Sequence, residues 1–528
     1  MLFIFNVKEK RKDRFITVMN ETSNNNRIVK NTIFLYFRMF FTSILSLYTA
    51  RVVLQTLGIE DFGIYNVVGG VVTFVGFVTA TMSSATQRYL SYNLGKQDSL
   101  AYRRTFSMLI NVYLIFCVLA LLILEIVGPI YIKKYMTLDA NRIYATQVVF
   151  QFTLLTFLVN TLSIPFKSSV IAYEKMGVYA YIGIIESVLH LLLAIVVSSS
   201  HVDHLILYGG LYGLMQVLIT LFLLFYCRFK LEDCKFIRYW SNDYFKELAS
   251  YAGWNLFGSI TGVLNLQGQA IVLNLFFGPI VNAAKAIGDR VNGMISQFAS
   301  NFYMAVTPQI IKSYASGDVE YMRKLVLSSS RYSFFMLFIV VAPLFVVIEP
   351  LLNLWLGSEQ VNLEMIRFCQ CTLIYMLVNV LEQPLTMTVR ATGKIKKYQV
   401  LVGLVTLTFI PFSVLMFYCG APAYFSVILL SIIYAIAHIL RMRIACPILK
   451  TNMANYSIRV LVPVVLVVAV TVVSILLISR FVCDKHWMIN IFTVILITLL
   501  ITVSIGITNS ERTILKKIII NKIRISNK

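Results

Sequence analysis

The residues of this chain that could do chemistry are ionisable groups inside long apolar stretches. Such a group costs at least about 2.5–3.5 kcal/mol in hydrocarbon, so it usually faces water, a ligand or an opposite charge. Arg38 lies in the stretch 31–54, and Glu186 and His190 are one helical turn apart in the stretch 177–198. A guanidinium can donate to two phosphate oxygens at once, and a carboxylate near a histidine can pass on a proton. The candidate chemistry is anion recognition and proton movement.

Polar side chains are densest around the stretch 283–307. They recur at intervals of three and four residues, which places them on one face of a helix. These residues are Asn282, Lys285, Asp289, Asn292, Ser296, Ser300 and Tyr303. A helix with such a face needs water or a polar ligand along that side. Lys285 and Asp289 are also spaced to neutralise each other, so the pattern fits either a cavity lining or an ion pair.

Weaker polar stripes along 63–83 and 250–277 complete a predicted substrate-binding cavity. Its predicted lining is Arg38, Asn66, Asn255, Asn265, Gln269, Lys285, Asp289, Arg290 and Asn292. The candidates for ion coupling are Glu186, His190 and Asp289, although the first two could equally form a structural hydrogen bond. Arg51 lies near the end of its stretch, where its side chain can extend to the headgroups. Glu382 precedes Gln383-Pro384 and could satisfy backbone groups freed by the proline.

The sequence contains no motif for catalysis or for a cofactor. It lacks the GxxxxGK[ST] phosphate loop, the HExxH zinc motif and a serine nucleophile elbow. Its eight cysteines form no CxxC pair and have no histidine at zinc spacing. We therefore expect no enzyme activity, no cofactor and no metal site, and an ion gradient, the membrane potential or product consumption as the source of energy.

The elements that carry these residues are predicted transmembrane helices. The chain of 528 residues is 58% hydrophobic and 13% charged, with a mean hydropathy of +0.78, whereas a soluble domain is about half apolar and about a quarter charged. Its apolar stretches reach the roughly 20 residues that a helix needs to cross about 30 Å of hydrocarbon. The sequence predicts an all-α integral membrane protein with about fourteen spans, at 31–54, 63–83, 105–130, 147–166, 177–198, 204–227, 250–277, 283–307, 329–349, 365–389, 398–418, 423–440, 459–479 and 488–508.

The basic residues predict how these spans are oriented. Most Lys and Arg lie near the two ends and in alternate connections, which is the positive-inside pattern. The net charge of +22 therefore indicates topology rather than nucleic-acid binding, and we expect both termini in the cytoplasm, with Arg441 and Arg443 in one cytoplasmic cluster. The connection that holds Lys133, Lys134 and Arg142 departs from this pattern.

An internal repeat relates spans one to three to spans seven to nine at an offset of about 220 residues. Gly58 corresponds to Gly278, and Gly95 corresponds to Gly317. Six spans per repeat predict two lobes related by a pseudo-twofold axis along the membrane normal, around a central cavity, plus two C-terminal helices. The predicted segments are a cytoplasmic tail at 1–30, an N-lobe at 31–227, a cytoplasmic linker at 228–249, a C-lobe at 250–440, spans thirteen and fourteen at 441–510 and a basic cytoplasmic tail at 511–528.

The first 30 residues are polar and basic, and their charges follow a very short apolar start. A signal peptide has the opposite order. We expect Met19 to be the natural start of the protein.

Two sequence motifs carry a family resemblance. Residues 48–66 read YTARVVLQTLGIEDFGIYN, and residues 83–90 read SSATQRYL. Both resemble the O-antigen and capsule flippase branch of the multidrug/oligosaccharidyl-lipid/polysaccharide (MOP) exporter superfamily. The resemblance implies a MATE-like fold in the bacterial inner membrane and transfer of a polyprenyl-pyrophosphate-linked oligosaccharide from the inner to the outer leaflet. It also implies H⁺ or Na⁺ coupling, contact with membrane lipid, and other polysaccharide-assembly membrane proteins as partners.

Two other functions are compatible with a chain of many spans. A drug or cation antiporter of the MATE type shares the implied fold, but it usually needs a cavity rich in carboxylates, whereas basic groups here at least match the acidic ones. A membrane polysaccharide polymerase or ligase generally has a long external loop. The external connections expected here are too short to form a domain of their own.

Overall fold

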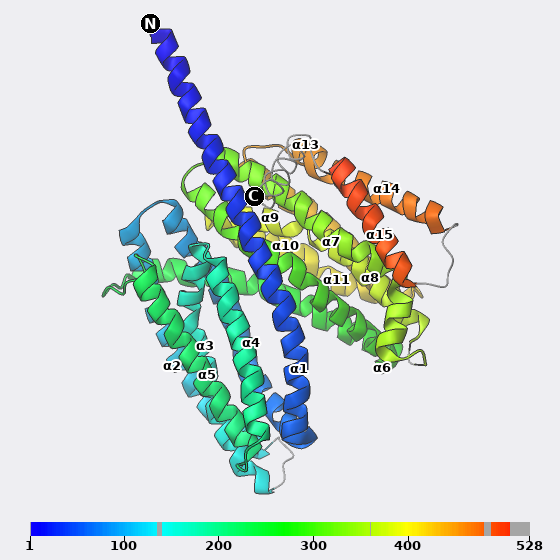
Figure 1. The fold of residues 1–528 in the computed structure, drawn as a ribbon. Helices are drawn as coiled ribbons and strands as arrows, with labels where there is room; N and C mark the ends of the chain where they lie inside the picture. Colours follow the sequence, from blue (N-terminus) through cyan, green and yellow to red (C-terminus); the bar gives the residue numbers. More distant parts are fainter. Residues whose placement is uncertain (1, 135–139, 360, 480–486, 507–528) are drawn as a thin grey trace, which may run out of the picture. The chain divides into compact units, whose positions relative to one another are not determined.

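The computed structural model describes residues 2–134, 140–359, 361–479 and 487–506, and in these ranges its regular structure is entirely helical (Figure 1). The predicted basic tail at 511–528 lies outside the described residues, and of residues 2–26 only the backbone is described. The helices are α1 (Leu2–Gly95), α2 (Ser99–Lys134), η1 (Ala140–Arg142), α3 (Ile143–Ala172), α4 (Met176–Ser198), α5 (His204–Lys230), α6 (Asn242–Ala315), α7 (Val319–Leu356), α8 (Leu363–Asn379), α9 (Glu382–Thr392), α10 (Lys396–Leu407), α11 (Phe409–Tyr418), α12 (Phe425–Ile448), α13 (Met453–Tyr456), η2 (Ser457–Leu461), α14 (Val462–Ser479), α15 (Trp487–Ile501) and η3 (Thr502–Gly506).

Twelve helical segments of the described chain are long and apolar enough to cross a membrane, and each coincides with one of the expected spans. The all-helical membrane architecture is thus confirmed. The expected spans 63–83 and 283–307 are helical continuations of α1 and α6 and are not among the twelve. The second of them carries Lys285, Asp289 and Arg290, and the first includes side chains outside the described set.

Two glycines interrupt the longest helices at the positions that the internal repeat relates. Gly58 in α1 has φ 75° and ψ 172°, and Gly278 in α6 has φ 76° and ψ −172°. This backbone region is accessible essentially to glycine alone. A β-carbon at either position would meet no atom within 4 Å, so the backbone conformation and not crowding requires glycine. The repeat therefore places the same kink in both helices.

The other related pair of glycines serves two different purposes. Gly317 has φ 78° and ends a helix by a left-handed turn. Gly95 is helical, and a β-carbon there would lie 2.6 Å from the backbone of Lys312. The first glycine permits a turn, whereas the second permits two helices to approach closely.

The chain folds as two compact units, residues 1–256 with 304–318 and residues 257–303 with 319–528. In the first unit α1 packs against α3 and α4, and α3 packs against α2 and α5. In the second unit α12 packs against α8, α9 and α10, and α7 packs against α8 and α15. Each unit has its own apolar core, around Phe150 in the first and around Phe368 in the second. The predicted lobe boundaries stay predictions.

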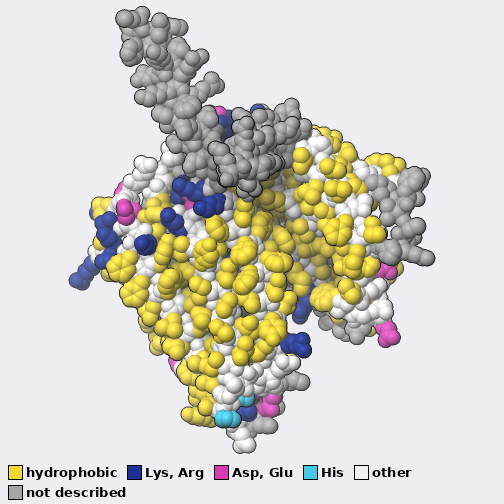
Figure 2. Space-filling view, viewed as in Figure 1, with side chains coloured by type: hydrophobic (Ala, Val, Ile, Leu, Met, Phe, Trp, Pro, Cys, Tyr) yellow, Lys and Arg dark blue, Asp and Glu magenta, His cyan; other side chains and the backbone are white. Residues whose placement is uncertain are grey.

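The outward faces of the helices are apolar. On α4 and α5 large hydrophobic side chains are exposed along most of the helix length, among them Leu192, Val196, Leu218 and Phe222. Figure 2 shows hydrophobic side chains spread over these helices, with charged side chains gathered toward their ends. Such a surface is stable in lipid and unfavourable in water.

Candidate functional site

The most polar helical face of the second unit carries an ion pair. Lys285 Nζ donates to Asp289 Oδ2 at 2.7 Å and lies 3.4 Å from the Leu266 carbonyl oxygen. The Lys285 side chain is 5% exposed, and that of Asp289 is 39% exposed. The pair expected from the i,i+4 spacing therefore forms, and Lys285 is a neutralised cation.

Two further residues of this helical segment are more accessible. Arg290 is exposed and, among the described residues, takes part in no ion pair. Asn292 accepts a hydrogen bond from Ser296 at 2.9 Å and remains partly exposed. Arg290 is therefore the cation on this face with its charge available to a ligand.

The buried amides of α6 join helices. Gln269 Nε2 donates to Ser426 Oγ at 3.0 Å, from α6 to α12, and Asn255 Nδ2 donates to the Thr81 carbonyl oxygen at 3.1 Å, from α6 to α1. Asn265 is buried beside Tyr434. Hydrogen bonds of this kind stabilise helix pairs inside membranes. Asn255 and Gln269 therefore bridge helices in the described conformation.

Arg38 lies in a slot between α1 and α4. Its guanidinium carbon is 4.6 Å from the centre of the Tyr179 ring, and within the described part of the chain its buried Nε has no hydrogen-bond partner. Gly183 leaves room for the side chain, because a β-carbon there would lie 3.0 Å from Arg38 Cδ. An aromatic face holds a cation without neutralising it, so Arg38 keeps its charge for an anionic ligand. Asn66, by contrast, is exposed and donates to the Phe62 carbonyl oxygen at 2.8 Å.

The two candidates for a proton relay have separate partners on α5. Glu186 accepts from Gln216 Nε2 at 2.8 Å. His190 Nε2 and the Tyr208 hydroxyl share a hydrogen bond of 2.8 Å, and the imidazole packs on Tyr212 at 5.0 Å between ring centres. The structure thus brings both residues to the same neighbouring helix without a bond between them.

Glu382 forms a buried ion pair that the sequence did not suggest. Arg441 lies inside the span Phe425–Ile448 and places a guanidinium nitrogen 2.5 Å from Glu382 Oε2. The expected position of Arg441 at the cytoplasmic side stays a prediction. Arg441 Nε also contacts the Tyr398 hydroxyl at 3.3 Å, which in turn bonds Thr386 at 2.6 Å. This compact polar cluster compensates the two charges within the second unit.

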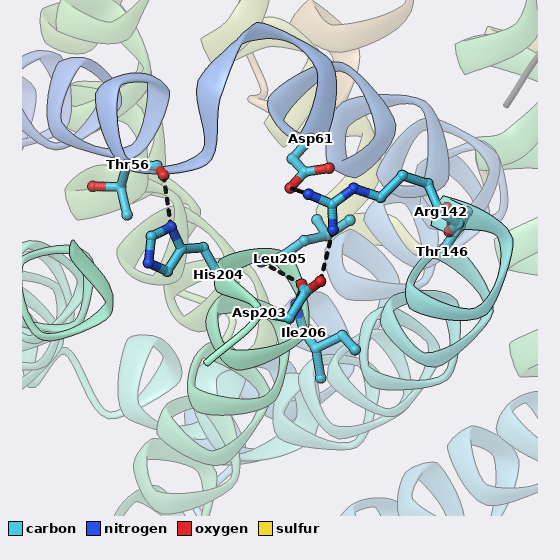
Figure 3. Close-up of polar contacts among 8 residues, drawn as sticks. All are labelled: Thr56, Asp61, Arg142, Thr146, Asp203, His204, Leu205 and Ile206. Carbon is cyan, nitrogen blue, oxygen red and sulfur yellow. Dashed lines mark hydrogen bonds and ion pairs between the residues drawn. The ribbon is translucent and has the colours of Figure 1, made fainter. Parts of the chain in front are cut away.

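A second unforeseen cluster joins three separated segments of the first unit (Figure 3). Arg142 donates to Asp61 at 3.0 Å and to Asp203 at 2.6 Å. The other oxygen of Asp203 caps α5, accepting from the backbone nitrogens of Leu205 and Ile206 at 3.1 Å each. Arg142, which lies in the connection that departs from the positive-inside pattern, is therefore held by two carboxylates.

The same cluster includes a buried acid and a histidine. Asp61 is 4% exposed, and burial raises its pKa above the usual value of 3.8 while Arg142 acts in the opposite direction. His204 Nδ1 lies 3.1 Å from the Thr56 carbonyl oxygen, next to the kink at Gly58. The cluster thus fixes the turn of α1 against η1 and the start of α5.

A further buried carboxylate lies between α3 and α4. Glu174 accepts from Gln309 at 2.5 Å, forms an ion pair with Lys312 and lies 3.5 Å from an Arg27 nitrogen. Burial lowers the pKa of Lys312 from its usual value, and Glu174 opposes that shift. These contacts attach the end of α6 to the first unit.

The fold and the polar sites together define a class, the multi-pass helical membrane transporters, in which polar groups line or brace spans that are otherwise apolar. In the described residues no cluster of His, Cys, Asp and Glu could hold a metal ion. The MatE family pattern matches residues 35–196 and again 259–415, in agreement with the repeat offset. The chain therefore belongs to the MatE family and is a transporter of the MOP superfamily.

Solved structures of this fold are similar along most of the chain. A multidrug resistance MATE family transporter of the MOP superfamily in an outward-facing conformation is 12% identical, with a TM-score of 0.67 over 83% of this chain and 96% of that chain. A MOP superfamily transporter from Pyrococcus furiosus Vc1 (DSM3638), described as having a binding pocket of reverse polarity that suggests a different function, is 13% identical, with a TM-score of 0.68 over 81% and 97%. A search of curated proteins found no match.

Proposed function

We propose that this transporter is a flippase for polyprenyl-pyrophosphate-linked oligosaccharide, moving it from the inner to the outer leaflet of a bacterial inner membrane. The product would enter O-antigen or capsule assembly alongside other membrane proteins of that process. Both termini would face the cytoplasm. The observation that carries the proposal is that Arg38, inside a candidate span, and Arg290, on the polar face of α6, take part in no ion pair among the described residues. Lys285 and Arg441, by contrast, are paired with Asp289 and Glu382.

The chemistry of the substrate explains why such arginines would be retained. The prenyl chain can stay in lipid, but an unpaired anion in hydrocarbon would cost tens of kcal/mol. A planar guanidinium donates to two phosphate oxygens at once and stays charged at any physiological pH. Arg38 could make such a contact in the first unit. In the second unit Arg290 could do so as well, and the polar residues near it can exchange hydrogen bonds with sugar hydroxyls.

The sequence motifs at residues 48–66 and 83–90 also support a polysaccharide cargo, since they resemble the flippase branch of the superfamily. The pocket described as of reverse polarity in the Pyrococcus furiosus structure indicates that pocket charge differs among transporters of this fold. Uncompensated arginines in the spans of this chain would select an anion over a cation.

Replacement of the two arginines tests the proposal. In a strain that lacks this transporter and accumulates inward-facing lipid-linked oligosaccharide, Arg38→Gln and Arg290→Gln should each restore export about 10- to 100-fold less well than the wild type, as expected for one lost charge-assisted contact. Arg51→Gln is the matched control, because Arg51 is exposed on the same helix as Arg38. Wild-type export by both test variants at normal abundance would remove the site assignment.

One observation favours a second candidate, a cation antiporter. Glu186 lies inside a span and, among the described residues, accepts a hydrogen bond from the neutral Gln216 and forms no ion pair. Such an acid could bind H⁺ or Na⁺ and couple an ion gradient to either cargo. Loss of transport on collapse of both gradients, together with loss in Glu186→Gln, would support coupling. Unchanged transport in both experiments would exclude ion coupling through Glu186.

A further inference from the structure

The connection between α5 and α6 presents an ordered pattern of aromatic and basic side chains. From residue 236 to residue 240 the exposed and partly buried side chains alternate. A period of two places alternate side chains of an extended segment on opposite faces. Phe236, Arg238 and Trp240 are exposed on one face, whereas Ile237 and Tyr239 are turned inward.

The inward face is bound to the first unit through its backbone. The Ile237 backbone nitrogen donates to Ser107 Oγ at 2.8 Å, and Asn111 Nδ2 donates to the Tyr239 carbonyl oxygen at 3.3 Å. Both partners lie on α2. The outward face is therefore held in place by main-chain contacts that do not depend on its side chains.

Side-chain contacts also hold the segment at two places, Asp233 before it and Tyr239 within it. Tyr173 donates to Asp233 Oδ2 at 2.9 Å, and Arg103 lies 3.6 Å from Asp233 Oδ1. Arg104 lies over the Tyr239 ring at 5.4 Å. Asp233 is thus already satisfied by two partners, and Arg104 is exposed beside Tyr239.

The aromatic groups of the outward face have an amphipathic arrangement. Phe236 is 54% exposed and Trp240 is 46% exposed. Trp240 Nε1 donates to Asn242 Oδ1 at 2.7 Å, and its ring stacks on Phe245 at 5.4 Å. The rings are thus held at the surface with an apolar side outward.

The segment lies where the spans end. It follows the span that ends at Lys230 and precedes the span that begins at Asn242, so it lies at the level of the lipid headgroups. The exposed basic side chains there are Arg104, Arg228, Lys230, Lys235 and Arg238. Figure 2 shows Lys and Arg side chains gathered at this end of the first unit beside hydrophobic ones.

We propose that residues 235–240 form a binding surface for anionic phospholipid, in which Arg238 and Arg104 contact the phosphate and Phe236 and Trp240 lie among the glycerol and upper acyl groups. Charge complementarity selects the lipid: clustered Lys and Arg at a bilayer surface attract anionic headgroups, and aromatic rings partition into the interface. The fixed backbone makes the surface rigid, so lipid binding loses little side-chain and backbone freedom.

The test measures lipid affinity and not transport, so its outcome is independent of the proposed cargo. Purified full-length protein in detergent is titrated with phosphatidylglycerol or phosphatidylcholine, and bound lipid is counted by native mass spectrometry. We expect tighter binding of phosphatidylglycerol, and an affinity for it about fivefold lower in Arg238→Gln. Trp240→Ala should weaken binding of phosphatidylglycerol as well.

The matched control is Arg443→Gln, because Arg443 is exposed near the end of α12, in the second unit. This variant should bind phosphatidylglycerol as the wild type does. Equal affinity for the two lipids, or an equal loss in Arg238→Gln and Arg443→Gln, would overturn the proposal. Unchanged affinity for phosphatidylglycerol in Arg238→Gln would overturn it too, because the arginine would then not contact the lipid.

Discussion

Arg142 shows how single residues stabilise this protein away from the spans. Its guanidinium bridges Asp61 and Asp203, which come from the turn of α1 and the start of α5. Among the residues that the structure describes, Asp61 Oδ1 is buried without a hydrogen-bond partner, so Arg142 is the main compensating contact of that carboxylate. The arginine is 35% exposed, and its contribution is smaller than that of a fully buried partner.

Replacing Arg142 by Gln should therefore destabilise the first unit. Two carboxylates would lose their shared cation, and one of them is almost fully buried, so we expect a loss of about 1–3 kcal/mol in the free energy of unfolding. Thermal unfolding of the purified protein in detergent measures this as a lower melting temperature. Asp61→Asn in the same chain should recover part of the loss, whereas a melting temperature equal to that of the wild type in Arg142→Gln alone would contradict the assignment.

Whether an ion pair could be predicted depends on how far apart its two residues lie in the sequence. Lys285 and Asp289 are one helical turn apart, so their ion pair was among the expected arrangements. The pairs Glu382 with Arg441 and Asp61 with Arg142 join residues far apart in the chain. No local rule connects such residues, and for that reason neither ion pair was predicted and Arg142 was an exception to the charge pattern.

At the scale of elements, the paired glycine kinks divide α1 and α6 at related positions. Gly58 and Gly278 share a backbone conformation that other residues reach only at a cost of about 1–3 kcal/mol. The kink of α1 is further fixed by the contact of His204 with Thr56 and by the ion pair of Asp61. Part of the cost of this geometry is thus offset by polar contacts of the first unit.

Gly278→Ala should lower the free energy of unfolding by about 1–3 kcal/mol, because the added β-carbon is strained by the backbone although the space around it is open. Gly293→Ala on the same helix is the matched control: its surroundings are equally open and its backbone is helical, so alanine should be neutral or stabilising there. Thermal unfolding of both variants checks this. Equal melting temperatures for the two variants would show that the backbone conformation at position 278 does not require glycine.

Hydropathy predicted most elements because the bilayer imposes both length and apolarity on a span. It is least informative for the segments after Gly58 and Gly278, where α1 and α6 continue as helices across the predicted boundaries. The repeat did predict that the two glycines correspond. It did not predict that Gly95 permits a close approach to Lys312, since contact between distant segments leaves no periodic signal.

At the scale of the whole molecule, the family establishes that the protein is a transporter, and the charged residues of the helices concern which cargo it carries. The two MatE matches and the fold establish a MOP superfamily transporter. The cargo depends on which intramembrane charges remain available. Arg38 and Glu186 lie in candidate spans, Arg290 lies on the polar face of α6, and among the described residues none of the three takes part in an ion pair, whereas Asn255 and Gln269 of α6 join helices. The arginines favour an anionic cargo, and Glu186 is the candidate for coupling it to an ion.

The most direct measurement uses the purified protein in sealed vesicles that contain a short polyprenyl-pyrophosphate-linked oligosaccharide in both leaflets. A glycosidase added outside reports how fast the inner pool becomes accessible. The account predicts exposure of the inner pool at least about tenfold faster than in protein-free vesicles, and no export of organic cations from the same preparation. An oligosaccharide rate equal to that of protein-free vesicles, with organic-cation export driven by a proton or sodium gradient, would contradict it.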